Sequence, residues 1–287
     1  MNKTKTFLEM IKFEHSIFAL PFAFLGLLLA ERGWPRPHIL LGVTVVMVSF
    51  RTFGMALNRL IDVPIDAANP RTKNRALPAG QLKSSFVWGA AAVSFLIFEV
   101  TAWRLSPLCF YLSPVPVLLT WLYPWMKRFT WFSHFVLGII LGLAPYGAWL
   151  AARGEFSWVP GLLTLGVAAW VAGFDIIYAL QDMEFDRSSG LHSIPAHFGP
   201  AAALTVTRIL HGITVAAWVF AGKLAGLGWI YQAGLALAAV FLIWEHRLIQ
   251  SQGLKKIDQA FFTMNAVVSI SVFVFAAADL TFGAFTS

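Results

Sequence analysis

The chain has 287 residues, of which 58% are hydrophobic and 12% are charged, and its mean hydropathy is +0.71. Such a composition excludes an ordinary soluble domain and indicates an integral membrane protein. The net charge of +7 does not indicate nucleic-acid binding, because the basic residues are scattered singly between apolar segments. The only cysteine, Cys109, cannot form an intrachain disulfide.

Apolar segments of about 20 residues, the length of a membrane-spanning helix, recur along the whole chain. The first is expected to be retained, because it lacks a small-residue cleavage pattern and many further apolar segments follow it. The pattern predicts nine helices, at 14–31, 38–61, 86–104, 107–126, 132–151, 160–183, 201–221, 226–246 and 262–284. We therefore expect an all-α integral membrane protein in which residues 1–287 form one transmembrane domain.

The connections between these helices predict the orientation of the chain in the membrane. The three sizeable connections, 62–85, 184–200 and 247–261, all fall on the same side of a nine-helix bundle. Cytoplasmic loops carry an excess of Lys and Arg. With these connections inside, thirteen basic residues are cytoplasmic, five lie outside and three lie within spans. We expect a cytoplasmic N-terminus, an outer C-terminus and a location in a bacterial plasma membrane.

The second predicted helix ends in a group of polar residues. Acidic residues at the ends of otherwise apolar helices usually mark function, because an unpaired carboxylate is costly there. At about 3.6 residues per turn, Arg51, Asn58 and Asp62 share one face of this helix. Pro64 is expected to disrupt the helix just after Asp62, so we expect a loop or distorted turn to present Asp66.

A second acidic group lies at the end of the sixth predicted helix. The same spacing places Asp175, Asp182 and Asp186 on one stripe, with Tyr178 on the same flank. The segments NRLIDVPIDAANPRTKNRALPAG (58–80) and ALQDMEFDRSSGLHSIPAHFG (179–199) share an Asp-x3-Asp pair followed by a basic, Pro-containing loop, with the paired acids 120 residues apart. This pattern indicates a weak internal repeat, with motif halves 58–80 and 175–199 that face one cavity.

The residue types in these two segments favour a magnesium site. Clustered carboxylates and an amide oxygen are hard ligands, suited to Mg²⁺ that bridges to substrate phosphates. Zinc is not favoured, because the seven histidines show no paired spacing and a lone cysteine cannot form a thiolate cluster. Basic residues in the same connections suit an anion that arrives with its metal. These are Arg71, Lys73, Arg75, Lys127, Arg128 and Arg187.

Three segments together resemble the UbiA superfamily of intramembrane prenyltransferases: the one from Asn58, YPWMKR from Tyr123, and DIIYALQDMEFDRSSGLHSIPAHFG from Asp175. The resemblance covers essentially the whole chain and implies a nine-helix fold. It implies that Mg²⁺ on the diphosphate of a prenyl donor is coordinated by Asn58, Asp62, Asp66, Asp175, Asp182 and Asp186. Of these, Asp62, Asp66, Asp182 and Asp186 would be catalytic. It also implies diphosphate contacts from Arg71, Arg75, Tyr123 and Lys127, and a role for Arg51 as partner of an acceptor carboxylate.

The resemblance leaves the acceptor open. Arg59 stands where the commonest family pattern has Asp, and the opening KFEHSIFALPFA is more similar to a branch associated with menaquinone formation than to the ubiquinone-pathway enzyme. We expect Mg²⁺-dependent transfer of a polyprenyl group from its diphosphate to an aromatic acid such as 4-hydroxybenzoate, in ubiquinone or menaquinone biosynthesis. The ring of Tyr178 is a candidate to stabilise the allylic cation.

Two alternatives are kept beside this expectation. Within the enzyme class, the acceptor is homogentisate, haem, chlorophyllide or a glycerol phosphate. In a different functional class, the protein is a cation-coupled transporter, because intramembrane acids also bind cations in transporters. The expected partners are therefore a polyprenyl diphosphate, a small aromatic acid and the lipid bilayer, with no nucleic acid, and the oligomeric state stays open.

Overall fold

The structure is a computed structural model that describes residues 3–13, 16–252 and 257–282, and all regular secondary structure in these ranges is helical. The elements are α1 (Lys3–Met10), α2 (Ser16–Glu31), α3 (Pro37–Ile61), α4 (Val63–Ala68), α5 (Ser84–Leu105), α6 (Pro107–Leu112), α7 (Pro114–Met126), α8 (Ser133–Arg153), α9 (Trp158–Ala179), the 3-10 helix η2 (Leu180–Asp182), α10 (Met183–Ser188), α11 (Ile194–Ala225), α12 (Trp229–Gln252) and α13 (Ile257–Phe282). The predicted all-α class is confirmed.

Most of these helices have the length and composition of membrane spans. The described residues contain eight helical segments long and apolar enough to cross a bilayer, and α2 adds a shorter apolar stretch, Leu20–Glu31. Each of the nine predicted helix ranges overlaps one of these segments. Glu14 and His15 of the opening segment, and residues 253–256 of the predicted connection 247–261, lie outside the described residues.

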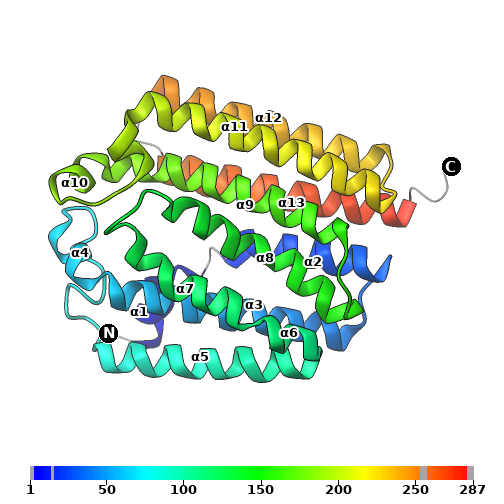
Figure 1. Cartoon of the computed structure of the whole chain (residues 1–287), viewed down its shortest axis with the longest axis horizontal. Coiled ribbons are helices and arrows are strands. Elements are labelled where there is room, and N and C mark those ends of the chain that lie inside the picture. The colour runs from blue at the N-terminus through cyan, green and yellow to red at the C-terminus, as the bar shows by residue number, and fades with distance from the viewer. Residues whose placement is uncertain (1–2, 14–15, 253–256, 283–287) are drawn as a thin grey trace.

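The two ends of the bundle differ in character. Figure 1 shows α1, α4 and α10 together at one end, whereas α13 finishes at the opposite end. Three strongly exposed tryptophans lie at that opposite end: Trp34 in the loop before α3, Trp158 at the start of α9 and Trp229 at the start of α12, with exposed fractions of 77%, 81% and 67%. Tryptophan is enriched at membrane–water interfaces, so this end has the side chains of an interfacial belt.

Two of the four hydrophobic cores in the described residues contain most of the buried side chains. The larger core joins α2, α8, α9, α11, α12 and α13, with Phe22 stacked on Trp218 at a ring-centroid distance of 5.0 Å and tilted against Trp170 at 5.3 Å. The smaller joins α1, α3, α5 and the connection after α4. Helix α9 is the most deeply buried span. In its most apolar stretch 67% of the residues are buried inside the protein, against 17 to 39% in the other spans.

Several element boundaries differ from the sequence-based prediction for local reasons. The predicted helix at 107–126 is interrupted at Ser113, just before Pro114, and forms α6 and α7. Helix α11 begins at Ile194 rather than at 201, because the Ser193 side chain caps it by accepting a hydrogen bond from the Ala196 N–H at 3.3 Å. Gly199, with a φ of 84°, then kinks the helix where the sequence suggests a loop. Helix α1 was not predicted.

Candidate functional site

The first acidic motif lies at a helix break. Helix α3 ends at Ile61, and the Asp62 N–H still donates to the Asn58 carbonyl at 3.0 Å. Pro64 ends α3 as predicted, but it also fits the first turn of a new helix, α4, so Asp66 lies on a helix. The prediction that a loop or distorted turn presents Asp66 is therefore wrong.

The second motif is built in a similar way. Helix α9 ends at Ala179, the 3-10 turn η2 follows, and α10 begins at Met183. The prediction of one regular helical stripe through Asp175, Asp182 and Asp186 is therefore wrong, because the 3-10 turn tightens the chain between the first acid and the last. The three side chains still reach the same cavity. A long helix, a break and a six-residue helix thus occur in both motifs.

A cavity of about 530 Å³ lies at the end of the bundle where α4 and α10 are located. All twelve residues that the sequence singles out for metal or substrate line it: Arg51, Asn58, Asp62, Asp66, Arg71, Arg75, Tyr123, Lys127, Asp175, Tyr178, Asp182 and Asp186. They come from α3, α4, the connection after α4, α7, α9, η2 and α10. The two motifs therefore face one space, as the repeat suggested.

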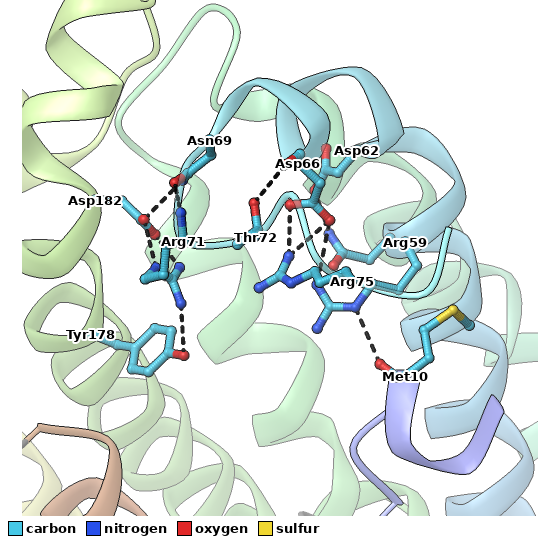
Figure 2. A network of polar contacts seen from close by, with 11 residues as sticks. Met10, Arg59, Asp62, Asp66, Asn69, Arg71, Thr72, Arg75, Tyr178 and Asp182 are labelled. Atoms are coloured by element: carbon cyan, nitrogen blue, oxygen red, sulfur yellow. Dashed lines mark hydrogen bonds and ion pairs between the residues drawn. The ribbon is translucent and has the colours of Figure 1, made fainter. Parts of the chain in front are cut away.

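Within the first motif, arginines surround the acid on α4. Asp66 is only 6% exposed and accepts hydrogen bonds from Nη1 of Arg75 at 2.7 and 2.9 Å. Nη1 of Arg59 lies 4.0 Å from the same carboxylate. Asp62 instead accepts a hydrogen bond from the Asn58 amide at 2.9 Å. Figure 2 shows Arg59 from α3 and Arg75 from the loop after α4 beside Asp66 of α4.

A cross-link joins the two motifs. Arg71, from the connection after α4, binds both carboxylate oxygens of Asp182, with 2.8 Å from Nε to Oδ1. The same guanidinium donates to the Tyr178 hydroxyl at 3.1 Å and lies 5.2 Å from the centre of its ring. Asn69 also donates to Asp182, at 3.0 Å (Figure 2). Asn69 did not stand out in the sequence, because an Asn before a Pro is an ordinary turn signal.

The remaining acids of the second motif have partners on other elements. Nζ of Lys127, at the end of α7, lies 3.7 Å from Oδ2 of Asp186, and the backbone N–H of His192 fixes the Lys127 carbonyl at 2.7 Å. Asp186 is 2% exposed, and its Oδ2 accepts no hydrogen bond within the described part of the chain. A buried carboxylate oxygen without a donor is poised to take a cation.

His134 on α8 is a site residue that the sequence analysis left out. Its Nδ1 lies 2.7 Å from Oδ2 of Asp175, and its Nε2 accepts the backbone N–H of Ile194 at 3.3 Å. Because Nε2 is an acceptor there, Nδ1 carries the proton and donates to the carboxylate. No local signal marks His134, since its partner is 41 residues away.

Burial changes the acidity of Asp62. Loss of solvent and, next, the neighbouring Asp66 carboxylate raise the pKa of Asp62 to about 6. Lys127, Arg128 and Arg59 oppose that rise without cancelling it. A bound cation would favour the ionised form of Asp62 and offset this cost.

The donor set fits magnesium shared with a phosphate ligand. The described residues contain no group of three or more His, Cys, Asp or Glu side chains already close enough to hold a metal ion alone. Mg²⁺ in phosphate sites typically takes one or two carboxylates, and phosphate oxygens and water complete its shell. Two carboxylates suit this arrangement: Asp186, whose Oδ2 has the 3.7 Å ion pair with Lys127 but no hydrogen bond in the described residues, and Asp62, which accepts a hydrogen bond from Asn58.

A second cavity of about 560 Å³ continues from the first into the apolar part of the bundle. Its wall is almost wholly hydrophobic and includes Phe22, Phe98 and Trp170. Four residues line both cavities and mark their junction: Arg51, Met55, Asn58 and Tyr123. At that junction, Nη2 of Arg51 donates to the Lys12 carbonyl at 3.3 Å, so the segment after α1 closes one side of the polar cavity.

The chain is similar to known proteins in sequence and in fold. The pattern of the UbiA prenyltransferase family matches residues 19–267. The 4-hydroxybenzoate octaprenyltransferase of Vibrio campbellii is 27% identical over 269 residues, covering 93% of this chain and 94% of that protein. The apo structure of a UbiA homolog from Aeropyrum pernix K1 is 34% identical and has a TM-score of 0.84, covering 93% of this chain and 98% of that one. A UbiA homolog from Archaeoglobus fulgidus, solved with DMAPP and Mg²⁺, is 20% identical with a TM-score of 0.75, covering 96% of this chain and 99% of that one, and shares the fold.

Proposed function

This chain belongs to the UbiA prenyltransferase family, and we propose that it transfers a polyprenyl group from polyprenyl diphosphate to an aromatic carboxylic acid such as 4-hydroxybenzoate. The reaction needs Mg²⁺ and serves respiratory quinone biosynthesis, of ubiquinone or menaquinone. The observation that carries the proposal is the joined pair of cavities, one lined by six metal-binding candidates and six basic side chains, the other almost wholly apolar. A diphosphate fits the first and a polyprenyl tail fits the second.

Substrate binding exchanges internal ion pairs for contacts with the diphosphate. Three acids form ion pairs with cations of the cavity: Asp66 with Arg75, Asp182 with Arg71 and Asp186 with Lys127. A magnesium diphosphate offers each partner a replacement, since the cations can bind phosphate oxygens and the carboxylates can bind the metal. The pairs therefore keep the charges compensated until the donor enters. Asn58, Asp62 and Asp175 complete the metal-binding set.

The chemistry is an electrophilic alkylation of the acceptor ring. The bond between the prenyl carbon and the diphosphate oxygen breaks, and the electron pair leaves with the diphosphate. Mg²⁺, when bound, supplies Lewis-acid stabilisation of that leaving group. Arg71, Arg75 and Lys127 add fixed positive charge where negative charge develops. A ring carbon of the acceptor then bonds to the prenyl cation, and the ring loses a proton.

Two tyrosines line the route of the prenyl cation. Tyr123 lies at the junction of the cavities and can contact the diphosphate. The Tyr178 hydroxyl accepts a hydrogen bond from Arg71, which also lies over its ring. Once Arg71 turns to the diphosphate, the ring face of Tyr178 can stabilise the allylic cation.

The assignment of the acceptor rests on Arg51 and on the relatives. Arg51 lies where the polar and apolar cavities meet, so a carboxylate bound there places its aromatic ring beside the reacting end of the prenyl chain. The Vibrio campbellii relative is named for 4-hydroxybenzoate, an acid of this type. The Archaeoglobus fulgidus homolog bound DMAPP with Mg²⁺, which agrees with the donor chemistry.

Purified protein in nanodiscs provides the direct test. With a polyprenyl diphosphate, 4-hydroxybenzoate and Mg²⁺, we expect release of diphosphate together with a prenylated acid, and neither product after chelation of the metal. Phenol, which lacks the carboxylate, should be a much poorer acceptor, and Arg51→Gln should remove this preference. Diphosphate release without any prenylated aromatic product would contradict the proposed acceptor class. Quinone extraction from cells lacking the gene then separates the ubiquinone and menaquinone pathways.

We also propose that residues 1–287 form one domain whose repeated motif halves, 58–80 and 175–199, face the cytoplasm. The excess of basic residues in the connections on that side supports this orientation. Labelling of intact cells with a membrane-impermeant thiol reagent, on a Cys109→Ser background, tests it. Glu155→Cys, at the other end of the bundle, should be labelled, whereas Ser189→Cys should be protected. The reverse result would invert the topology.

A further inference from the structure

Arg59 lies among the acids of the first motif, and the proposed mechanism gives it no role. It belongs to the last turn of α3, directly after Asn58, and its side chain is 12% exposed. It lines the polar cavity but not the apolar cavity, unlike Arg51. Arg59 therefore lies on the diphosphate side of the junction rather than on the acceptor side.

Within the described residues, Arg59 has no carboxylate at hydrogen-bond distance. Its Nε donates to the Met10 carbonyl at 3.3 Å, and its only ion pair within the described residues is the 4.0 Å approach of Nη1 to Asp66. Arg75 holds both oxygens of that carboxylate more closely, at 2.7 and 2.9 Å (Figure 2). One carboxylate thus serves two guanidinium groups. An additional anion beside Arg59 would balance the excess positive charge.

The geometry suits a phosphate oxygen. A guanidinium group presents several donors in a planar fork that matches phosphate, and the Met10 contact uses Nε alone. We propose that Arg59 binds the diphosphate directly, as a fixed cation in the first motif that takes over part of the charge neutralisation a metal ion would provide. This inference rests on the proposed prenyl diphosphate chemistry.

A purely structural role for Arg59 predicts a different outcome. The contact with the Met10 carbonyl ties α1 to α3, and the approach to Asp66 could simply orient that acid. If Arg59 only orients Asp66, removing it should weaken both metal binding and diphosphate binding. If Arg59 binds the diphosphate, removing it should weaken diphosphate binding, while metal binding without diphosphate stays equal or tightens, because a like charge has been removed.

The test uses the full-length protein in nanodiscs with two probes, Mn²⁺ alone and inorganic pyrophosphate with Mg²⁺. We expect Arg59→Gln to weaken pyrophosphate binding about tenfold or more, the usual effect of losing a hydrogen bond to a charged group. Binding of Mn²⁺ alone should be unchanged or tighter. Arg59→Lys, which keeps the charge, should recover part of the pyrophosphate affinity, and binding of 4-hydroxybenzoate should not change.

Lys83→Gln is the control. Lys83 lies at the end of the connection after α4, is exposed and does not line the cavity. Its removal should leave pyrophosphate binding within about twofold, because exposed charges are screened. Unchanged pyrophosphate binding in Arg59→Gln, or a parallel loss of Mn²⁺ binding, would overturn the inference. If the wild-type protein bound no pyrophosphate with Mg²⁺, the proposed function would fail, and this inference with it.

Discussion

The two acidic motifs hold their carboxylates in different ways. In the first motif the partners are local: Asn58 donates to Asp62, and Arg75, nine residues from Asp66, holds that acid. In the second motif every partner comes from a distant part of the chain, 41 to 113 residues away. These partners are His134 for Asp175, Arg71 and Asn69 for Asp182 and Lys127 for Asp186.

This difference indicates how each motif depends on the rest of the fold. The first motif can adopt its local geometry as soon as α3, α4 and the following loop form. The second motif is complete only when α7, α8 and the first motif have packed against it. Arg71 and Asn69 therefore join the two halves as well as lining the site. Variants of the two motifs should differ in stability even where they agree in lost activity.

The largest expected loss of activity comes from replacing Asp62 or Asp182. Asp62→Ala and Asp182→Ala should each lower prenyl transfer by about 10³-fold or more, because the charge on the departing diphosphate loses stabilisation. Asp182→Ala should also lower the thermal unfolding temperature, since Arg71 and Asn69 lose their shared partner, whereas Asp62→Ala should not. The measurements are product formation and thermal unfolding in detergent.

Glu184→Gln is the control for both variants, because Glu184 lies exposed on α10 and does not line the cavity. It should insert into the membrane and transfer prenyl groups as the wild type does. Near-normal activity in either Asp variant would contradict the shared diphosphate site. Equal losses of stability in Asp62→Ala and Asp182→Ala would remove the proposed difference between the motifs.

An intermediate effect is expected at His134, which acts on the site through Asp175. His134→Leu should raise the Mg²⁺ concentration for half-maximal activity by about 10- to 100-fold, because the carboxylate loses the donor that orients it. His134→Asn, which can still donate a hydrogen bond, should be closer to wild type. Ser133→Ala tests for general disruption, since Ser133 is equally buried and contacts no acid. An unchanged Mg²⁺ requirement in His134→Leu would show that Asp175 is positioned without it.

The smallest effect concerns the cost of ionising Asp62 in the metal-free protein. The pKa of Asp62 is raised from 3.8 to about 6, so the stability gained from its protonated form is lost as the pH rises through about 6. Asp62→Asn should therefore become more stable than the wild type as the pH rises from about 4 to about 7, by roughly 2 kcal/mol in the free energy of unfolding. Thermal unfolding with a chelator across this range measures the difference. Parallel pH profiles of wild type and Asp62→Asn would show that folding does not raise the pKa of Asp62.

The twelve site residues were chosen from the sequence, and the structure brings all of them to one cavity. This agreement has a physical basis, since polar residues at the ends of apolar helices can only lie at the membrane boundary, and two such groups with one spacing face the same side. The errors of the prediction concern local helix boundaries. Pro64 was treated only as a helix breaker, although it also begins α4, and a 3-10 turn interrupts the acidic stripe after α9.

By itself, the sequence determined that the chain crosses the membrane repeatedly, that it carries two acidic motifs, and that they hold hard oxygen ligands beside basic residues. Hydropathy and helical spacing are properties of neighbouring residues, so they can be read without the fold. Only the tertiary structure decided which cation holds which acid, that His134 and Asn69 belong to the site, and that Arg59 lies on the diphosphate side of the junction. Those facts depend on contacts between distant segments, which packing alone creates.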